Sequence, residues 1–234
     1  MAFYGTMFGD KHTYRDWGLL PKTRATISAP EAKIIEKNLT GADDVIELTK
    51  SITPDVKFNR RTYSQEFIVL DARAKWWSIY STILNYLQGQ SMKMVLDEDP
   101  SFYYYGRFKV NEWKSDKAYS VIALEGNINA YKYETTSSTE DWLWDTFNFE
   151  DGIIRDYRNI EINGEYTLVI LGRRKRVIPV FTCTAPLTVT YNGQSYDLPV
   201  GERKVTNIAL GEGNHELIFR GHGVVTVEYR GASL

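Results

Sequence analysis

The side chains that most often catalyse reactions or bind transition metals are scarce in this sequence. The 234 residues contain three histidines, His12, His215 and His222, and one cysteine, Cys183. Nucleophilic catalysis needs a nucleophile, a base and an orienting group, but no serine lies in a GxSxG motif and His12 is far from the other histidines in the sequence. His215 and His222 flank the strand-like run ELIFR across an expected hairpin, without the third ligand that a zinc site requires. We therefore expect both at surface turns, and Cys183, inside the strand-like VFTCTA, as a buried, unreactive thiol.

Two runs of charged residues are the remaining candidates for ligand binding. Asp97, Glu98 and Asp99 could attract a cation, but they lack the ligand spacing and glycine of a calcium loop, and Pro100 favours a solvated turn. The densest positive charge lies in an expected loop between two strand-like runs and consists of Arg173, Arg174, Lys175 and Arg176. This loop either contacts an acidic partner or a phosphate, or is solvated. With no GxxxxGKS, GxxxxGKT or GxGxxG phosphate loop present, the sequence predicts no cofactor and no metal site.

Composition narrows the class of protein further. The 28 basic and 30 acidic residues give a net charge of -2, which argues against a dedicated nucleic-acid binder. No run of about 18 apolar residues predicts a membrane span, and the first residues do not resemble a signal peptide. A single cysteine excludes an internal disulfide and indicates synthesis in a reducing cytosol.

One segment is expected to be a long helix that packs through one face. In residues 71–89 the apolar side chains recur with the i, i+3, i+4, i+7 spacing of a one-sided helix. Asp71 is placed to cap its start and Gly89 to end it in a left-handed conformation. The expected buried stripe consists of Trp76, Ile79, Tyr80, Ile83, Leu84 and Leu87. Trp77 falls beside this stripe, and we expect it to pack against a flanking strand.

Most of the remaining sequence predicts antiparallel β-structure in two parts. Short runs rich in β-branched and aromatic residues follow one another, separated by turn residues. All six tryptophans precede residue 145, and the polar run TTSST at 135–139 suggests a linker. We therefore expect a first domain at 1–134, a linker at 135–144 and a second domain at 145–234. The second contains seven strand candidates and the hairpin signal Asn192-Gly193, typical of a β-sandwich.

Several motifs in the first part resemble those of the distal tail protein family (Dit) of long-tailed phages. FGDKHTYRDWGLLP at 8–21 is similar to the opening of the family, and LTGADDVIELT at 39–49 to its hairpin. The segment 75–110 is the most similar: a helix, then a turn containing DEDP, then YYGR. AYKYE at 130–134 is similar to the element that ends the family's first domain. The motif positions outside the hairpin and the helix stripe are Asp16, Trp17, Gly18, Leu19, Gly89, Leu96, Asp97, Asp99, Pro100, Tyr104, Gly106 and Arg107.

The resemblance implies a mainly β protein with a structural role. Its first domain would be a β-sandwich with one α-helix and a hairpin arm, and its second a galectin-like or carbohydrate-module-like sandwich. Similar proteins form a homo-hexameric ring, single or stacked, at the virion tail tip. The ring joins the tail tube protein to the tail-associated fibre or lysin hub and, in some phages, to receptor-binding proteins. DNA passes through its channel without sequence-specific contacts, and assembly takes place in the host cytoplasm.

The resemblance also suggests roles for particular residues. Asp97, Asp99 and Pro100 set the turn before the next strand, Gly106 allows a close approach, and Arg107 is paired within the fold or across a subunit boundary. The candidate inter-subunit arm consists of Leu39, Thr40, Gly41, Asp43, Asp44, Leu48 and Thr49.

Two alternatives to a structural ring protein remain open at this point. The second part could be a module that binds cell-wall carbohydrate, although it lacks tryptophan and offers only Tyr157, Tyr166, Tyr191, Tyr196 and Tyr229 as stacking platforms. A pair of carboxylates assembled only in space, as in glycoside hydrolases, would leave no signature in the spacing.

Overall fold

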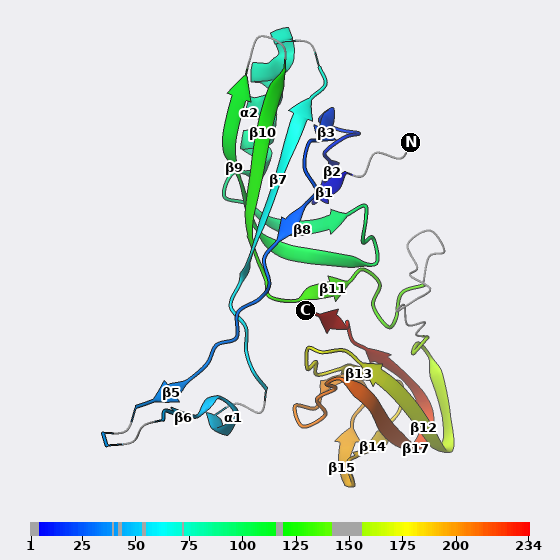
Figure 1. Ribbon diagram of the computed structural model, residues 1–234. Coiled ribbons are helices and arrows are strands. Elements are labelled where there is room, and N and C mark those ends of the chain that lie inside the picture. The colour runs from blue at the N-terminus through cyan, green and yellow to red at the C-terminus, as the bar shows by residue number, and fades with distance from the viewer. Residues whose placement is uncertain are drawn as a thin grey trace. The chain divides into compact units, whose positions relative to one another are not determined.

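The chain is mainly β and divides into two compact units in the computed structural model (Figure 1). The structure describes residues 5–38, 40–41, 44–52, 55–71, 73–115, 119–141 and 156–234. The first unit comprises Met1–Glu98 with Tyr104–Ala130, and the second comprises Asp99–Tyr103 with Tyr131–Leu234. The chain therefore enters the second unit briefly at 99–103, returns to the first, and enters the second again at 131.

The first unit is built on one antiparallel sheet with the strand order β2-β1-β8-β9-β10-β7-β3, and β4 also pairs with β7. Its strands are β1 (Thr6–Phe8), β2 (Lys11–His12), β3 (Leu19–Pro21), β4 (Thr26–Ile27), β7 (Arg61–Val69), β8 (Ser91–Leu96), β9 (Phe102–Ser115) and β10 (Ser120–Ile128). The pairing of β10 with β7 is unbroken from Ser120 opposite Val69 to Ile128 opposite Arg61. Three short elements, β5 (Glu36–Lys37), β6 (Ile46–Glu47) and α1 (Thr49–Ile52), lie between β4 and β7 in the chain.

The helix expected from the apolar spacing is α2 (Trp76–Leu87), preceded by the 3-10 turn η1 (Arg73–Lys75). Asp71 does not cap it, so that expectation was wrong: the helix begins after Lys75 and has no side-chain cap. The Asp71 carbonyl accepts the indole N–H of Trp76 at 2.8 Å, and its carboxylate pairs with Lys75. Gly89 does adopt the left-handed conformation, with φ of +71°.

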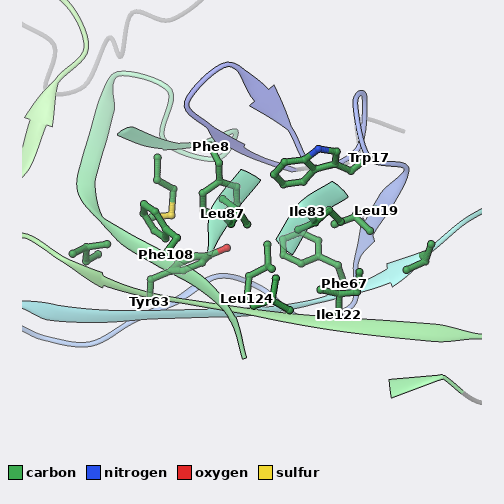
Figure 2. Packing of buried hydrophobic residues seen from close by; sticks show 14 of the residues in the cluster. Phe8, Trp17, Leu19, Tyr63, Phe67, Ile83, Leu87, Phe108, Ile122 and Leu124 are labelled. Carbon is green, nitrogen blue, oxygen red and sulfur yellow. The ribbon is translucent and has the colours of Figure 1, made fainter. Parts of the chain in front are cut away.

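The core of the first unit lies between α2 and the sheet (Figure 2). Ile83 and Leu87 of the helix are fully buried, and Trp76 is 5% exposed. Ile79, Tyr80 and Leu84 pack against the same cluster but stay partly exposed. On the strands, Phe67, Phe108, Ile122 and Leu124 are among the buried side chains of this cluster. The helix is therefore an apolar cover on one face of the sheet.

The second unit is a curled antiparallel sheet with the order β15-β14-β17-β13-β16, and β12 pairs with the other edge of β17. Its strands are β11 (Lys132–Glu134), β12 (Ile160–Gly172), β13 (Val180–Cys183), β14 (Leu187–Tyr191), β15 (Gln194–Leu198), β16 (Gly201–Lys204), β17 (Gly213–Glu228) and β18 (Ala232–Ser233). β11 pairs with β18 and with the Phe102–Tyr103 end of β9. The predicted hairpin at Asn192-Gly193 joins β14 to β15, with both residues at positive φ.

Three of the expected strands differ from the structure. HELIFRG and GVVTVEYR do not form a hairpin. They form one continuous strand, β17, because the chain stays within the sheet at Gly221, whose φ is +128°. β17 pairs with β14 up to Gly221 and with β13 from Val225 onward, so the glycine region marks a change of partner. KVTNIAL is not a strand beyond Lys204; it turns, and places Ile208 and Leu210 in the second core.

The polar run TTSST is packed against the second sheet rather than solvated. Ser138 is fully buried: its hydroxyl donates to the Val227 carbonyl at 2.8 Å and accepts the Tyr229 N–H at 2.7 Å. Ser137 is 7% exposed, and its N–H donates to the Glu140 carboxylate. Small hydroxyl side chains fit here because they satisfy buried backbone groups without adding volume.

Candidate functional site

The segment between β4 and β7 forms an arm, defined here as residues 28–60. Its two sides run antiparallel: the Ser28 N–H donates to the Thr62 carbonyl at 3.0 Å, and the Asn59 N–H to the Glu31 carbonyl at 2.8 Å. Farther along, β5 pairs with β6, with Glu36 opposite Glu47 and Lys37 opposite Ile46. None of the described arm residues belongs to the hydrophobic cluster of the first unit. The arm is therefore held by backbone hydrogen bonds rather than by a core of its own.

The apolar residues of the arm are exposed to solvent. The exposed fractions are 57% for Ile34, 42% for Ile35, 47% for Val45 and 44% for Ile46. Scattered surface aliphatics are ordinary, but four in one short ribbon form an exposed patch of the kind that marks interaction surfaces.

The predicted arm residues divide into two groups. Thr40, Gly41 and Asp44 are exposed near the end of the ribbon, with Gly41 at φ of +89°. Leu39 and Asp43 lie outside the described residues.

Leu48 and Thr49, by contrast, form hydrogen bonds within the arm. The Leu48 N–H donates to the Ile35 carbonyl at 2.8 Å, and the Thr49 hydroxyl accepts the Ile35 N–H at 3.0 Å. Thr49 is only 2% exposed. Through these bonds the two residues hold the two sides of the arm together.

A second exposed apolar feature is an aromatic ledge formed by Trp77, Tyr80 and Trp113. Trp77, on the first turn of α2, is 67% exposed. Its ring centroid lies 4.3 Å from that of Trp113 on β9, and Tyr80 stacks on Trp113 at 4.9 Å. Trp77 thus contacts a flanking strand as expected from the sequence, yet most of its surface remains open to solvent.

The DWGL motif builds the core of the first unit. Trp17 is 7% exposed and Leu19 is fully buried, both in the hydrophobic cluster. The Asp16 carboxylate accepts the His12 N–H at 2.7 Å, and Gly18 adopts φ of +62°. These residues therefore stabilise the entry to β3 rather than present a ligand site.

Asp97 fixes the buried His12. The Asp97 carboxylate accepts the Gly5 N–H at 2.7 Å and lies 3.0 Å from His12 Nε2. His12 Nδ1 accepts the N–H groups of Tyr14 and Arg15, so Nε2 carries the proton that is donated to Asp97. With both ring nitrogens engaged and 4% of its surface exposed, His12 is a structural residue.

Gly106 and Arg107 are both engaged within the first unit. A Cβ at Gly106 would lie 2.5 Å from the Asn127 carbonyl oxygen and 2.6 Å from Ile128 Cα, so only glycine fits opposite β10. Arg107 is exposed and donates to the Gly89 carbonyl. Tyr104 is 7% exposed and Leu96 packs against the same cluster.

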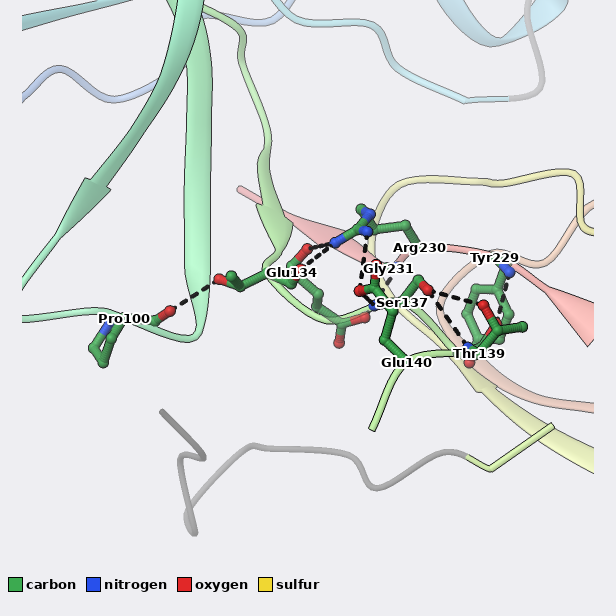
Figure 3. A network of polar contacts seen from close by, with 10 residues as sticks. Pro100, Glu134, Ser137, Thr139, Glu140, Tyr229, Arg230 and Gly231 are labelled. Carbon is green, nitrogen blue, oxygen red and sulfur yellow. Dashed lines mark hydrogen bonds and ion pairs between the residues drawn. The ribbon is translucent and has the colours of Figure 1, made fainter. Parts of the chain in front are cut away.

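A network of polar contacts joins distant segments of the second unit, and Figure 3 shows the part of it around Glu134, Arg230 and Gly231. The Arg173 guanidinium lies 2.7 Å from the Glu134 carboxylate, with 14% and 9% of the two side chains exposed. The same carboxylate accepts the Gly231 N–H at 3.0 Å, and Arg230 donates to the Glu134 carbonyl at 2.6 Å. Asp99 pairs with Lys132 at 2.7 Å. We call this set, Asp99, Lys132, Glu134, Arg173 and Arg230, the clamp.

The basic run at 173–176 is a loop, as expected, but it is largely engaged with its own chain. Arg173 belongs to the clamp, and Lys175 donates to the Tyr133 hydroxyl at 3.0 Å and lies over its ring. Arg174 pairs with Glu212 at the surface, and Arg176 is exposed. The partners of Arg173, Arg174 and Lys175 therefore come from distant parts of the same chain.

The other residues with possible chemistry are also satisfied. His215 accepts the Tyr191 hydroxyl on Nδ1 at 2.8 Å and donates from Nε2 to the Gly211 carbonyl at 2.9 Å. His222 lies on the same strand, bonded to Asn163, and not across a hairpin. Burial raises the pKa of the Cys183 thiol. In the described part of the chain, no three potential metal ligands come together.

Most tyrosines of the second unit are unsuitable as sugar platforms. Tyr191 and Tyr229 are buried in the second hydrophobic cluster, and Tyr157 and Tyr196 pack against it. Among the described tyrosines of this unit, Tyr166 is the most exposed, at 40%.

Comparison with known proteins identifies the fold. No protein-family model and no curated protein matches the sequence. Among solved structures, the crystal structure of the Dit protein of phage SPP1 superposes with a TM-score of 0.64, over 100% of both chains. The chain has the fold of a phage distal tail protein.

The likeness to Dit extends over both units at 11% sequence identity. The β-rich architecture of both units thus agrees with one known full-length fold. The SPP1 protein is described as a paradigm of the hub of the adsorption apparatus in phages that infect Gram-positive bacteria. Among the described residues, no helix of this chain is long and apolar enough to cross a membrane.

Proposed function

We propose that this protein is a non-enzymatic structural component of a phage tail tip, assembled as a homo-hexameric ring that joins the tail tube to the tail-tip or baseplate hub. The observation that carries the proposal is the whole-length likeness to the SPP1 Dit fold. The engaged state of the catalytically capable side chains, His12, His215 and Cys183, agrees with a structural role.

The arm supports assembly through unlike surfaces. A ring forms when one patch of each copy contacts a different patch of the next and the rotation closes. An arm without its own core, carrying exposed Ile34, Ile35, Val45 and Ile46, is suited to be the donor patch. Aromatic side chains are enriched at such interfaces.

The uncovered face of the first sheet is suited to line a channel for DNA. It carries two ion pairs, Lys109 with Glu125 at 3.2 Å and Lys22 with Glu66 at 2.8 Å. The bond to Lys22 lowers the pKa of the Glu66 carboxyl, so this pair stays charged at neutral pH. Paired cations make fewer contacts with phosphates, and few contacts allow DNA to pass without being held.

The proposed partners follow from the proposed place in the virion. The ring would contact the tail tube protein on one side and the tail-associated fibre or lysin hub on the other. The second unit would face outward, toward receptor-binding proteins or cell-wall carbohydrate.

The test is the mass of the full chain in solution. Light scattering and sedimentation over a wide concentration range should give six times 27.0 kDa, approached by mass action as concentration rises. Negative-stain electron microscopy of that species should show a ring with an axial opening. A chain that stays monomeric at every concentration, in buffers of low and high salt, would overturn the proposal.

A further inference from the structure

The uncovered face of the first sheet carries a groove that crosses three strands. β7, β10 and β9 lie side by side in this sheet (Figure 1). Two rows of directly paired residues border the groove, Thr62–Asn127–Arg107 on one side and Ser64–Glu125–Lys109 on the other. Residues that pair directly across strands share a face of the sheet. The exposed side chains of Arg107 and Lys109 place both rows on the face away from the core.

The charges that line the groove favour an anion. Among the described lining residues the cations are Arg60, Arg107 and Lys109, and the carboxylate is Glu125. The groove thus has a net charge of +2 at neutral pH, in a chain whose net charge is -2. Positive charge gathered in a concave surface concentrates the electrostatic potential there and attracts anions.

The three cations keep donors that their own chain does not use. Arg60 is exposed and forms no ion pair and no hydrogen bond with the described residues. Arg107 donates to the Gly89 carbonyl, and the other N–H groups of its guanidinium have no acceptor among the described residues. Lys109 pairs with Glu125 at 3.2 Å, and an ammonium group has three N–H donors. Each cation can therefore bind an oxygen of a ligand.

Neutral donors lie beside these cations. The Val110 N–H donates to Gln88 Oε1 at 3.2 Å, so the amide nitrogen of Gln88, at the β9 edge of the groove, remains a donor. The hydroxyls of Thr62 and Ser64 and the amide of Asn127 also line the groove. Phosphate oxygens accept hydrogen bonds from guanidinium, ammonium, amide and hydroxyl groups. This set of donors is therefore suited to phosphate.

The dimensions of the groove favour linked phosphates over a single ion. Its volume is about 760 Å³, whereas one water molecule occupies about 30 Å³ of the liquid. Arg60 directly precedes β7 and Arg107 lies on β9, with β10 between these strands. Neighbouring strands are ~4.8 Å apart, so the backbones that carry the two arginines are about 10 Å apart. The groove can therefore contact successive phosphates of one nucleic-acid strand.

Building on the proposed channel, we propose that this groove contacts phosphate groups of DNA that passes along the first sheet. Arg60, Arg107 and Lys109 provide the charged contacts. Phosphate contacts position a duplex and carry no sequence information. Because three contacts give an affinity that is low and falls as salt rises, the groove guides the DNA backbone without retaining it.

Binding of a fluorescent DNA duplex to the full chain, followed by anisotropy over a range of salt concentrations, tests the groove. With three phosphate contacts, the logarithm of the binding constant should fall against the logarithm of salt concentration with a slope of about -3. Arg60→Gln should weaken binding about tenfold at low salt and make the slope shallower by about 0.9. The matched control, Arg203→Gln, removes an exposed cation of the second unit and should change neither quantity.

Removing the carboxylate of the groove should have the opposite effect. Glu125→Gln leaves Lys109 without its partner and raises the positive charge of the groove. Duplex binding should become severalfold tighter, a gain that a misfolded variant would not give. Glu216→Gln, at an exposed position of the second unit, is the matched control and should bind as the unchanged chain does. Unchanged binding by both Arg60→Gln and Glu125→Gln would overturn the proposal.

Inorganic phosphate separates a DNA contact from a site for a free anion. Phosphate should displace the duplex no better than sodium chloride of equal ionic strength. Calorimetric binding of phosphate alone that Arg60→Gln abolishes would overturn the assignment to DNA. Light scattering on the same samples reports assembly. An assembled chain that does not bind the duplex overturns the groove proposal and leaves the ring, whereas a chain that binds it but stays monomeric overturns the ring and leaves the phosphate contacts.

Discussion

Different kinds of contact hold the segments of the two units together. In the first, α2 covers the sheet with an apolar face centred on the fully buried Ile83 and Leu87. In the second, charged groups of the clamp hold the entering segments 99–103 and 131–135 to the strand end near Gly231. An apolar cover depends on volume and tolerates similar side chains, whereas a polar clamp requires every partner to be present. The difference predicts that the two units respond to different kinds of substitution.

The largest effect is expected from a charge in the apolar cover. Ile83→Asp should prevent folding of the first unit, because a buried carboxylate without a partner costs several kcal/mol. Leu84→Asp should cost less, because Leu84 is only partly buried. Near-UV circular dichroism and thermal unfolding measure the effect, with the exposed Thr82→Asp as control. A folded Ile83→Asp with an unchanged spectrum would contradict the assigned helix face.

Removing one charged partner of the clamp should cause the second-largest loss of stability. Glu134→Ala removes the carboxylate that pairs with the mostly buried Arg173, and should lower the free energy of unfolding by about 3 kcal/mol. Arg174→Ala, on the neighbouring exposed pair, should change little. Chemical denaturation of both variants and of the Glu134→Ala/Arg173→Ala double variant measures the coupling. Equal losses for Glu134→Ala and Arg174→Ala would show that the clamp does not close the second unit.

A smaller loss of stability is expected from a substitution at Gly106, where the backbones of two strands of the first sheet approach closely. Gly106→Ala places a methyl group 2.5 Å from the Asn127 carbonyl oxygen, and should cost roughly 1–3 kcal/mol as β9 and β10 separate. Gly211→Ala is the control, since no heavy atom lies within 4 Å of the added Cβ. If both variants melt at the same temperature, the close approach is not needed.

The smallest effect concerns pH and the buried Tyr63. Burial raises its pKa above the ordinary value of 10.0, so the unfolded chain loses this proton at a lower pH than the folded chain. Its contribution to stability is complete below pH ~10 and falls as the pH rises further. Tyr63→Phe should therefore show a shallower decline of melting temperature above pH ~10 than the unchanged chain. An equally steep decline would show that other tyrosines cause the loss of stability at alkaline pH.

Local patterns in the sequence predict the elements of the first unit well. The spacing of Ile79, Ile83 and Leu87 indicates α2 because a helix face repeats every few residues. Runs rich in β-branched and aromatic side chains indicate β7 and β10, because such side chains favour strands. Asp71 shows the limit of such reasoning: it is a good cap by type, but the chain makes a 3-10 turn before the helix begins.

Features that depend on distant residues could not be predicted in this way. Arg173 looks like part of a free basic loop, yet its partner, Glu134, is 39 residues away in the chain. Gly221 resembles a turn residue, yet it lies inside β17 because two different strands pair on either side of it. The exposed ledge could not be inferred either, because an amphipathic pattern does not show how far Trp77 is covered.

The passage of the chain through the second unit at 99–103, before β10 is complete, has a consequence for folding during synthesis. Phe102 and Tyr103 leave the ribosome long before their neighbours in β11, and β11 in turn waits for β18 at Ala232–Ser233. Domains generally fold as units as the chain emerges, but here the loop from Tyr103 to Ala232 must close before the second unit is complete, and long loops close slowly. The second unit therefore finishes folding only when its last strand arrives. Until then β11 has an unpaired edge that a chaperone or a neighbouring copy would encounter first.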